Sequence, residues 1–533
     1  MKHRPLAVLS AATTTLLLLT GCAGSVGTGN AAESDHLRVA YGWYPTCFDY
    51  AQSNPFAIFG RQVLDTLLSE DPDTGELKPY LADSWEERDG GRVYEFTIRD
   101  GVTFSNGQEL TAQVVADNFE TLWQFAEQGV SPTPGAYLRG FDHAEVVNPE
   151  TVRIVFTEPN AGFLQANTEG QFGIIAPESL AKTPEERCAE GTIGSGPFVL
   201  DQAVQDERIE YLKRTGYDWA PTTFGRTGEA AIDRLTIQIV PEESGRSAGL
   251  IAGDYDLAYS IFQTGADQAA GRDDVTSVLA PNKGVINSFI PNTADPVLAD
   301  LAVRQALQHG IDRDELVESF YGPGVEAATD VVSRGHPFYQ DRSDLLRYDQ
   351  DLSRSILDSA GWIPGPDGVR EKAGQPLEVT LNFGSGDIGA VGAGWEYVQA
   401  RLAEIGIALK LAPISTAQKT DLRKSGAWQL SIDQGAARGD ADGIAAYYST
   451  KLSVYKGLAP RPEIDALLAE QAVTIDQDKR HQLVDEAVTK IIEDGYGIPL
   501  YDSAQVLLVR NAVTGLTFPI NSWEPIFYGV AKS

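Results

Sequence analysis

Strands and helices alternate along the second half of this 533-residue chain, and this order constrains the fold more than any other feature of the sequence. After about residue 286, segments with the apolar spacing of helices stand between segments with the spacing of strands. Parallel neighbouring strands need a crossover connection, which is usually a helix. We therefore expect an α/β fold with a mostly parallel sheet here. The expected helices are 300–310, 352–361 and 395–406, and the expected strands are 377–383, 407–414 and 428–434.

The first half mixes strands and helices in a less regular order. It contains no internal repeat and no low-complexity tract. The chain exceeds the size at which a single hydrophobic core stops growing, so two or three lobes are expected. The patterns predict strands at 36–41, 92–100, 206–214, 231–240 and 254–260, a hairpin over 144–158 turned at Asn148-Pro149, and helices at 61–70, 115–128 and 244–253.

The N-terminus has the composition of an export signal. Lys2 and Arg4 precede an apolar run over residues 6–19, which is shorter than the roughly 20 residues that a spanning helix needs. The run ends in Leu19-Thr20-Gly21-Cys22, which resembles the lipobox of bacterial lipoproteins. We expect a signal peptide over 1–21, lipidation of Cys22, a membrane anchor on the outer face of the cell membrane and a flexible tether over 22–35. The alternative is a plain signal peptide in which Cys22 is one more small apolar residue.

The charge balance and the cysteine count narrow the function classes. The net charge of −33 repels phosphate backbones and anionic headgroups, which argues against nucleic-acid binding. The chain has three cysteines, so assigning Cys22 to lipid leaves Cys47 and Cys188 as an even pair in a compartment where disulfides persist. We predict that they are bonded. The alternative is two unrelated buried thiols.

Eight segments in a fixed order resemble one family. Residues 77–122, LKPYLADSWEERDGGRVYEFTIRDGVTFSNGQELTAQVVADNFETL, closely resemble the signature region of the family 5 bacterial extracellular solute-binding proteins, the peptide and nickel binders of ABC importers. The second specific match is DLAVRQALQHGIDRDELV. The remaining matches are IGSGPFVL, PEESGRSAGLIAGDYDLAYS, DQDLSRSILDSAGW, LAEIGIALKL, GDADGIAAYY and DKRHQLVDEAVTKIIEDGYGIPLY, so the resemblance covers nearly the whole exported chain.

The resemblance implies a two-lobed fold of the periplasmic-binding-protein (Venus flytrap) type, with mixed sheets flanked by helices and the ligand closed between the lobes. Lobe I would comprise 36–285 plus 505–533, with an inserted subdomain at about 76–190. Lobe II would comprise 286–504, so the chain would cross between lobes near residues 285 and 505. The partners implied are a small-molecule or peptide ligand and the permease subunits of an ABC importer, and a monomer is expected.

Three motifs that are typical of other functions are weighed against this reading. Gly384, Gly386 and Gly389 have the G-x-G-x-x-G spacing of a dinucleotide site, but the next strand ends without the required acid. The loop could instead hold an anion through backbone N–H groups, or be a flexible surface loop. Gly245-Arg246-Ser247-Ala248-Gly249 matches the nucleophile elbow of α/β-hydrolases, yet its Ser247 falls inside a predicted helix.

The third motif is Asp71-Pro72-Asp73-Thr74-Gly75, which begins like a calcium loop but lacks its third ligand and its glutamate, so we interpret it as a turn. The histidines are not at metal-ligand spacing and no CxxC occurs. No metal site, cofactor or catalytic residue is therefore expected.

Clefts between lobes are lined by aromatic side chains with a few polar anchors, and the candidates here stand at predicted strand ends and in loops. Each could equally belong to the core. The candidate ligand-binding residues are Tyr41, Trp43, Tyr44, Tyr259, Phe262, Gln263, Gly386, Trp395, Asp433, Arg438 and Trp523.

The loop after residue 433 departs from the pattern of the peptide-binding relatives. They carry an aspartate there that pairs with the ligand's amino terminus, and the matching position in this chain is Ala437. Asp433 is an alternative anchor after a shift in register, whereas Arg438 would suit an anionic group or stay a solvated loop cation. The resemblance thus predicts a passive receptor, with a peptide or peptide-like ligand preferred. A secreted serine hydrolase and a sensor that is not coupled to import remain the alternatives.

Overall fold

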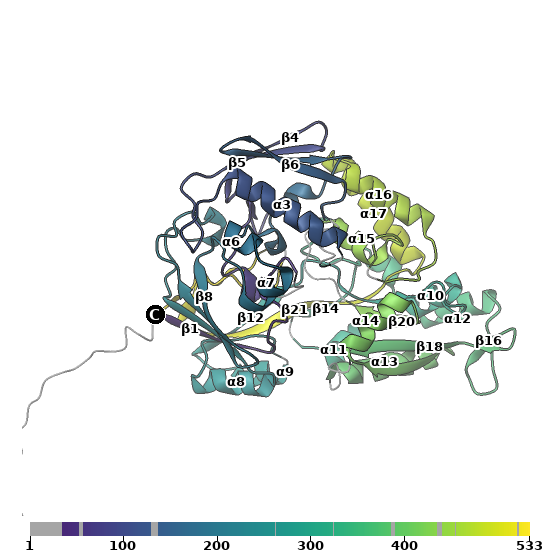
Figure 1. Cartoon of the computed structure of the whole chain (residues 1–533). Coiled ribbons are helices and arrows are strands. Elements are labelled where there is room, and N and C mark those ends of the chain that lie inside the picture. The colour runs from purple at the N-terminus through teal and green to yellow at the C-terminus, as the bar shows by residue number, and fades with distance from the viewer. Residues whose placement is uncertain are drawn as a thin grey trace, which may run out of the picture.

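The computed structural model describes residues 35–52, 57–128, 130, 137–261, 263–322, 324–384, 390–433, 440–453, 455–519 and 522–533. The predicted signal peptide, Cys22 and the tether up to residue 34 lie outside these ranges. Figure 1 shows two lobes side by side, joined by the long strand β21 (Ile498–Arg510). The predicted two-lobed α/β fold is therefore confirmed.

One sheet runs through both lobes because β21 pairs with strands of each. Its strand order is β19-β18-β20-β13-β21-β11-β1-β10-β9-β8, and β12 and β14 also pair with β21. The lobe I strands are β1 (His36–Tyr41), β8 (Phe198–Val204), β9 (Arg208–Lys213), β10 (Arg234–Ile239), β11 (Leu257–Ala258) and β12 (Val275–Pro281); the lobe II strands are β13 (Asn287–Pro291), β14 (Val325–Ala327), β18 (Glu378–Gly384), β19 (Ala408–Ile414) and β20 (Leu430–Asp433).

The strand directions make the C-terminal ends of the two lobes' strands face each other. β21 begins beside β13 and ends beside β11, so it runs from lobe II to lobe I. In lobe I, β11 is antiparallel to β21 while β1 and β10 share the direction of β11, so all three point at lobe II. In lobe II, β18, β19 and β20 have the direction of β21 and point at lobe I. We call the space between these strand ends the interlobe cleft.

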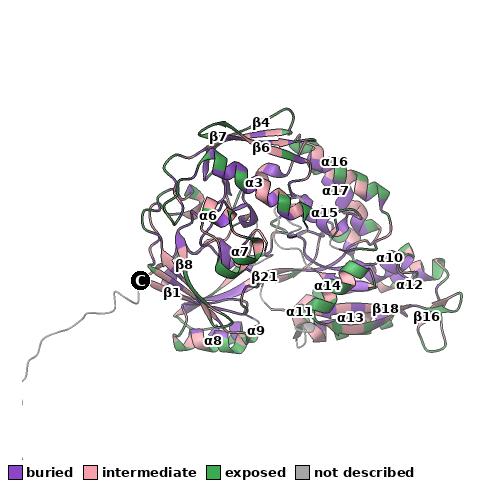
Figure 2. Ribbon diagram, viewed as in Figure 1, coloured by how far each residue is buried: buried purple, intermediate pink, exposed green. Residues whose placement is uncertain are grey.

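Helices cover both faces of the lobe II part of the sheet. One face packs into a core that includes Phe289, Trp395 and Leu402, and the other into a core that includes Ile290, Ile444 and Val488. Figure 2 shows buried residues concentrated where the helices meet the sheet. The helices are α10 (Leu301–His309), α11 (Arg313–Phe320), α12 (Gln350–Ser359), α13 (Ala390–Ala403), α14 (Thr416–Ser425), α15 (Asp442–Tyr448), α16 (Pro462–Val473) and α17 (Gln477–Glu493).

A smaller sheet forms an additional layer on lobe I. Its order is β4-β5-β7-β6, and helix α3 (Ala112–Glu127) packs on it. Thr111 caps α3 by accepting a hydrogen bond from Val114 N–H, and the apolar side of the helix joins the lobe I core. The strands are β4 (Ala82–Arg88), β5 (Val93–Ile98), β6 (Phe141–Asn148) and β7 (Thr151–Phe156); β2 (Leu68–Glu70) and β3 (Leu77–Pro79) pair separately, and the lobe I helices are α2 (Ala57–Gly60), α5 (Phe163–Ala166), α6 (Pro177–Leu180), α7 (Pro184–Glu190), α8 (Glu243–Ala252) and α9 (Gln263–Ala269).

This additional layer touches lobe II at a second place, away from the connecting strands, where Figure 1 shows α16 and α17 beside β4 and β6. Ala161 N–H donates to Ala472 O at 3.0 Å, and Arg139 donates to the same carbonyl at 3.1 Å. Gly162 faces the carboxylate of Asp442, and a Cβ on this glycine would lie 2.9 Å from Asp442 Oδ2. We call this set of residues the second contact.

Three sequence predictions about local structure meet different outcomes. Cys47 and Cys188 form the predicted disulfide, which links residues 141 apart in the chain. Residues 61–70 are not a helix: turns follow α2 and β2 begins at Leu68. The sheet of lobe II is also less parallel than predicted, because β13 is antiparallel to both of its neighbours.

The backbone of residues 61–70 forms hydrogen bonds to distant segments instead of the hydrogen bonds of a helix. Gly196 N–H donates to Val63 O, and Phe198 N–H donates to Gln62 O. The buried Asp65 carboxylate accepts hydrogen bonds from Trp219 Nε1 at 2.9 Å and from Ser195 Oγ at 2.9 Å. These bonds outweigh the helical spacing of the apolar side chains, because intrinsic propensity is a weak preference that tertiary context overrides.

Candidate functional site

Aromatic side chains gather at the lobe I side of the interlobe cleft. Tyr41 ends β1, and its ring centroid lies 4.9 Å from that of Trp43 and 5.0 Å from that of Tyr259, which follows β11. Tyr41 and Tyr259 are buried, whereas Trp43 is 38% exposed. Three of the predicted residues are therefore brought together, and Trp43 presents its ring to solvent.

A buried carboxylate from the end of the chain fixes this aromatic group. Tyr41 Oη donates to Glu524 Oε1 at 2.6 Å, and Ile58 N–H donates to Glu524 Oε2 at 2.6 Å. Burial and the adjacent Glu524 charge raise the pKa of Tyr41 well above its ordinary value, so its hydroxyl stays protonated and donates. Sequence reasoning did not single out Glu524, although it named its neighbour Trp523, which is half-buried against the same core.

Arg246 joins the loops that follow the parallel strands of lobe I. Its guanidinium donates to the carbonyls of Tyr259 and Ser260 after β11 and to those of Val240 and Pro241 after β10, at 2.7 to 2.8 Å. Burial lowers its pKa from the ordinary value. Arg246 lies in the GRSAG motif, so that motif positions the cleft loops.

Ser247 of the same motif lacks the geometry of a nucleophile elbow. It lies within α8, is fully buried, and its hydroxyl donates to helix carbonyls, including that of Glu243 at 3.3 Å. An elbow serine would instead project from a sharp turn after a strand.

On the lobe II side, Asp433 ends β20 and is surrounded by donors. Its carboxylate pairs with Arg423, lies 3.4 Å from Lys419 Nζ and accepts a hydrogen bond from Tyr455 Oη at 2.8 Å. The charge of Asp433 raises the pKa of Arg423 against the opposing effect of burial. Asp433 is thus bound by side chains of its own lobe, which does not favour it as an anchor for a ligand ammonium group.

Trp395 lies deeper than the sequence suggested. It is 1% exposed on α13 and packs against Phe289, with ring centroids 5.7 Å apart, and against Tyr501 of β21. Within the described part of the chain, its indole Nε1 has no hydrogen-bond partner, and the same holds for the hydroxyl of Tyr259 in lobe I.

The remaining predicted residues differ in how much of them the structure describes. Tyr44 is half-buried and packs against Phe48, with ring centroids 5.7 Å apart. Gln263 begins α9, and nothing is described of its side chain. Phe262, Gly386 and Arg438 lie outside the described residues, as does Ala437.

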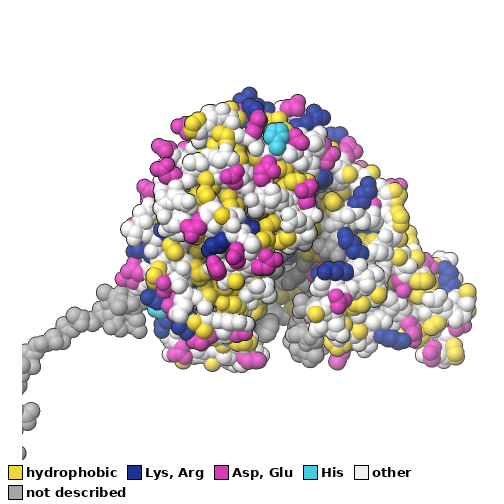
Figure 3. Space-filling view, in the orientation of Figure 1, with side chains coloured by type: hydrophobic (Ala, Val, Ile, Leu, Met, Phe, Trp, Pro, Cys, Tyr) yellow, Lys and Arg dark blue, Asp and Glu magenta, His cyan; other side chains and the backbone are white. Residues whose placement is uncertain are grey.

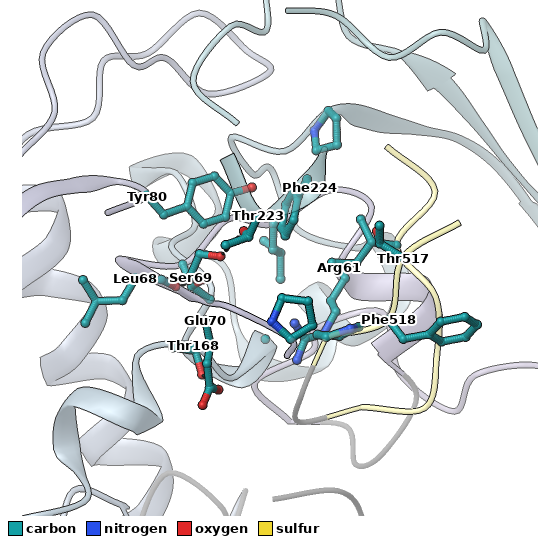
Figure 4. Close-up of a pocket in the computed structure, with 17 residues that line it drawn as sticks. Arg61, Leu68, Ser69, Glu70, Tyr80, Thr168, Thr223, Phe224, Thr517 and Phe518 are labelled. Atoms are coloured by element: carbon teal, nitrogen blue, oxygen red, sulfur yellow. Dashed lines mark hydrogen bonds between the residues drawn. The ribbon is translucent and has the colours of Figure 1, made fainter. Parts of the chain in front are cut away.

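A narrow cavity of about 40 Å³ lies within lobe I, and sequence reasoning missed it (Figure 4). Figure 4 shows Ser69, Glu70 and Thr168 on one side of it and Arg61 and Phe518 on another. Burial raises the pKa of Glu70 to about 8, to which the charges of Glu169 and Asp440 contribute. The sequence pattern predicts a helix over residues 61–70. That prediction gives no reason to expect Glu70 at a buried position.

Two further expectations concern metals and membranes. Asp71 Oδ1 accepts hydrogen bonds from the N–H groups of Asp73 and Thr74, which makes the DPDTG stretch a turn, as predicted. Within the described ranges, no group of three or more histidine, cysteine or acidic side chains has metal-binding geometry. None of the described helices is both long and apolar enough to cross a bilayer.

Comparison with known proteins finds relatives that this chain matches over most of their length. The nickel-binding periplasmic protein of Escherichia coli is 23% identical over 92% of this chain and 93% of its own length. Heme-binding protein A of Haemophilus influenzae is 26% identical, covering 88% of this chain and 87% of the relative. A probable di/tripeptide-binding protein of Pseudomonas aeruginosa is 25% identical, covering 88% and 91%.

Solved structures share the fold. The crystal structure of NikA from Brucella suis in complex with Fe(III)-EDTA has a TM-score of 0.80 and 25% sequence identity, covering 93% of this chain and 100% of that one. DppA from Helicobacter pylori in complex with the peptide STSA has a TM-score of 0.76 and 20% identity, covering 93% and 98%. Residues 76–455 match the family described as bacterial extracellular solute-binding proteins, family 5 Middle. The chain therefore belongs to the family 5 bacterial extracellular solute-binding proteins.

Proposed function

We propose that this protein is an extracytoplasmic receptor that captures a small solute between its lobes and delivers it to an ABC importer. The observation that carries the proposal is the arrangement of strand ends. The parallel strands of both lobes end at the same cleft, and α/β sheets bind ligands beyond the carboxyl ends of their strands. Figure 3 shows the surface hollowed between the lobes at this place.

Closure is the proposed mechanism. A ligand that contacts both lobes at once gains those contacts only in the closed state, so binding shifts the population toward closure. β21 and the connection between β12 and β13 link the lobes. The permease would read the closed form, and no step needs a nucleophile or a base.

The proposal includes a peptide or peptide-like solute and a lipid anchor at Cys22. Support for the solute comes from relatives named as di/tripeptide-binding and glutathione-binding proteins. Support for the anchor comes from the lipobox resemblance of Leu19-Thr20-Gly21-Cys22. A Cys22→Ser variant is expected to leave the membrane fraction and to lose labelling by radioactive palmitate.

Small-angle scattering combined with mass spectrometry tests the receptor role. The exported chain is titrated with a panel of peptides, glutathione, nickel–histidine and heme, and binding is detected by thermal stabilisation. A solute that binds is expected to reduce the radius of gyration and to be recovered unaltered. Superimposable scattering curves at saturation, or chemical conversion of the bound compound, contradict the proposal.

A further inference from the structure

The lobe I cavity contains a buried carboxyl group that the proposed closure mechanism does not use. Glu70, at the end of β2, is 8% exposed and lines the cavity together with Thr168. Its carboxylate accepts hydrogen bonds from Gln165 Nε2 and from Thr168 Oγ1. In the described part of the chain, no lysine or arginine lies within ion-pair distance of this carboxylate. Glu70 is therefore a buried acid without a paired cation.

Other buried acids of this protein are paired with a guanidinium. Asp330 pairs with Arg342, and their side chains are 0% and 6% exposed. Asp440 pairs with Arg480 at 2.5 Å, with side chains 6% and 4% exposed. Buried acids seldom lack such a partner, because removing a charge from water costs several kcal/mol unless another charge compensates it. The cavity at Glu70 thus lacks the cation that these two sites contain.

The size and the lining of the cavity limit what can enter it. Its volume of about 40 Å³ corresponds to about three water molecules, since each needs roughly 10 to 15 Å³. Apart from its polar side, the lining includes the apolar residues Leu68, Phe224 and Ile526. A whole peptide does not fit in this space. The end of a short alkyl chain with one polar group does.

The Glu70 side of the cavity lies near the place where the lobes connect. Pro72 lines the cavity, and its carbonyl accepts a hydrogen bond from Lys283 Nζ at 2.7 Å. Lys283 belongs to the connection between β12 and β13, which crosses between the lobes. The charge of Asp440 in lobe II also acts on Glu70. A solute held between the lobes therefore lies within reach of the cavity.

The charges around Glu70 favour a cation once this group is ionised. Burial raises the pKa of Glu70 to about 8, and the neighbouring acidic charges add to the effect. Three carboxylates then face two cations, in a chain whose net charge is −33, so the local field is negative. The charged groups around Glu70 are Glu169 beside Thr168, Asp440 of lobe II, Lys283 of the connecting segment and Arg61 across the cavity (Figure 4).

We propose that the lobe I cavity is a subsite for a protonated primary amine on a short alkyl chain, and that the solute captured between the lobes carries such a group. This inference rests on the proposed receptor function and specifies the chemistry of its ligand. Glu70 and Thr168 face the ammonium group. Leu68, Phe224 and Ile526 face the alkyl chain.

Binding exchanges a proton for the amine. An ammonium group has three N–H donors, and an ionised carboxylate accepts at both oxygens, so Glu70 receives the amine in addition to Gln165 and Thr168. In the free protein at pH 7 the carboxyl group is protonated, because its pKa is about 8. Its proton therefore passes to the solvent when the amine enters.

Isothermal titration with propylammonium chloride tests the subsite directly, and 1-propanol is the neutral control of similar size. At pH 7, propylammonium is expected to bind at least tenfold more tightly than propanol, about 1.4 kcal/mol. Titrations in phosphate and in Tris are expected to show release of close to one proton per bound amine. The affinity should rise about tenfold from pH 6 to pH 7 and level off above pH 8, where the free carboxyl group is already ionised.

Two variants assign the effect to Glu70. Glu70→Gln keeps an oxygen acceptor but does not ionise, so it is expected to bind propylammonium at least tenfold more weakly than the wild type and to release no proton. Its affinity for propanol should stay unchanged. Glu76→Gln is the matched control, because it removes the same charge from a side chain between β2 and β3 that is 67% exposed. This variant is expected to bind both compounds like the wild type.

Several outcomes overturn the inference. They are equal affinities for propylammonium and propanol, binding of the amine without proton release, and no binding of either compound. An equal loss of affinity in Glu70→Gln and Glu76→Gln also overturns it, because the effect would then come from the overall charge. The receptor role is judged separately by the scattering curves with the solute panel, so the amine subsite can fail while that role stands.

Discussion

At the residue scale, the lobe I cavity contains a carboxyl group whose burial makes its charge costly. Glu70 accepts hydrogen bonds from Gln165 and Thr168, and burial raises its pKa from 4.5 to about 8. Below pH 4.5 the group is neutral in both states. Between 4.5 and 8 the unfolded chain is ionised there while the folded protein keeps the proton, so stability is lost as the pH rises through this window.

Glu70→Gln is expected to remove that loss. The amide of glutamine still offers an oxygen acceptor to Gln165 and carries no charge. The free energy of unfolding of the variant should therefore exceed that of the wild type by about 3 kcal/mol at pH 9, and the two values should be similar at pH 5. Urea unfolding at pH 5, 7 and 9 measures the difference. The exposed Glu76→Gln is the control, and parallel stability curves for Glu70→Gln and the wild type would contradict the prediction.

Aromatic residues of the cleft differ in how far the sequence could place them. The position of Tyr41 and Tyr259 at strand ends followed from strand patterns, and both meet in the structure. Trp395 also followed a predicted strand and loop, yet it is buried beneath β21. Exposure depends on which elements pack above a side chain, and the sequence pattern does not contain that information.

At the scale of elements, one arginine of α8 holds the loops after two strands. The four carbonyls that Arg246 binds would be left without that donor in Arg246→Met. We expect a loss of about 3 kcal/mol in the free energy of unfolding, since one unsatisfied buried polar group costs about 1 to 3 kcal/mol and a broken buried network lies at the upper end of the range for single substitutions.

Ligand affinity provides the second readout of this variant. The loops that Arg246 joins carry Tyr259 and Ser260, so binding should weaken about tenfold in titrations at a temperature where the variant stays folded. Arg272→Met is the control, because Arg272 is exposed and forms an ion pair with the exposed Asp274. Unchanged affinity in folded Arg246→Met would show that the loops keep their positions without it.

The disulfide joins the segment after β1 to α7. Cys47 and Cys188 enclose a loop with a sequence separation of 141 residues. In the chain-entropy model, closing such a loop stabilises the fold by about 5 kcal/mol. The double variant Cys47→Ala/Cys188→Ala is expected to lose most of this, as measured by chemical denaturation, with no effect on the order of ligand affinities. A loss below about 1 kcal/mol would contradict the prediction.

At the scale of the whole molecule, the lobes meet at the second contact as well as along the connecting strands, so we expect this contact to take part in closure. Asp440 is held by Arg480, with Nη2 to Oδ1 at 2.5 Å, so it stays charged and its pKa is lowered despite burial. Burial and the charge of Asp440 raise the pKa of Asp442, against the opposing charges of Arg139 and Arg480. Among the residues that the structure describes, Asp442 Oδ2 has no hydrogen-bond partner. Because Gly162 of lobe I lies against Asp442, we expect the burial of this carboxyl on closure to favour its protonated form, against the opposing charge of Arg139, and closure to weaken as the pH rises.

Two substitutions at the second contact are expected to act in opposite directions. Gly162→Val places a side chain against Asp442 and should hold the lobes apart, while Asp442→Asn removes the buried charge and should favour closure at neutral pH. Scattering of the ligand-free protein should give a larger radius of gyration for the first variant. The second should lose the pH dependence seen in the wild type.

Unfolding measurements separate these effects from simple damage. The second contact lies between the lobes and is additional to the core of each, so Gly162→Val is expected to change the free energy of unfolding by less than about 1 kcal/mol. Identical scattering curves for the two variants and the wild type across pH 5 to 9 would show that the second contact does not affect closure.

The sequence by itself determined the fold class, the order of most elements and the cysteine pairing, because period-two and helical spacings are local properties and a compartment that permits disulfides leaves two cysteines to pair. Only the tertiary structure decided where residues 61–70 find their hydrogen-bond partners, that Asp433 is already paired, and which aromatic rings reach the cleft. Those outcomes depend on burial by segments such as 194–198 and 498–510, which are distant in the chain. Desolvation and hydrogen bonding by such neighbours override local preference.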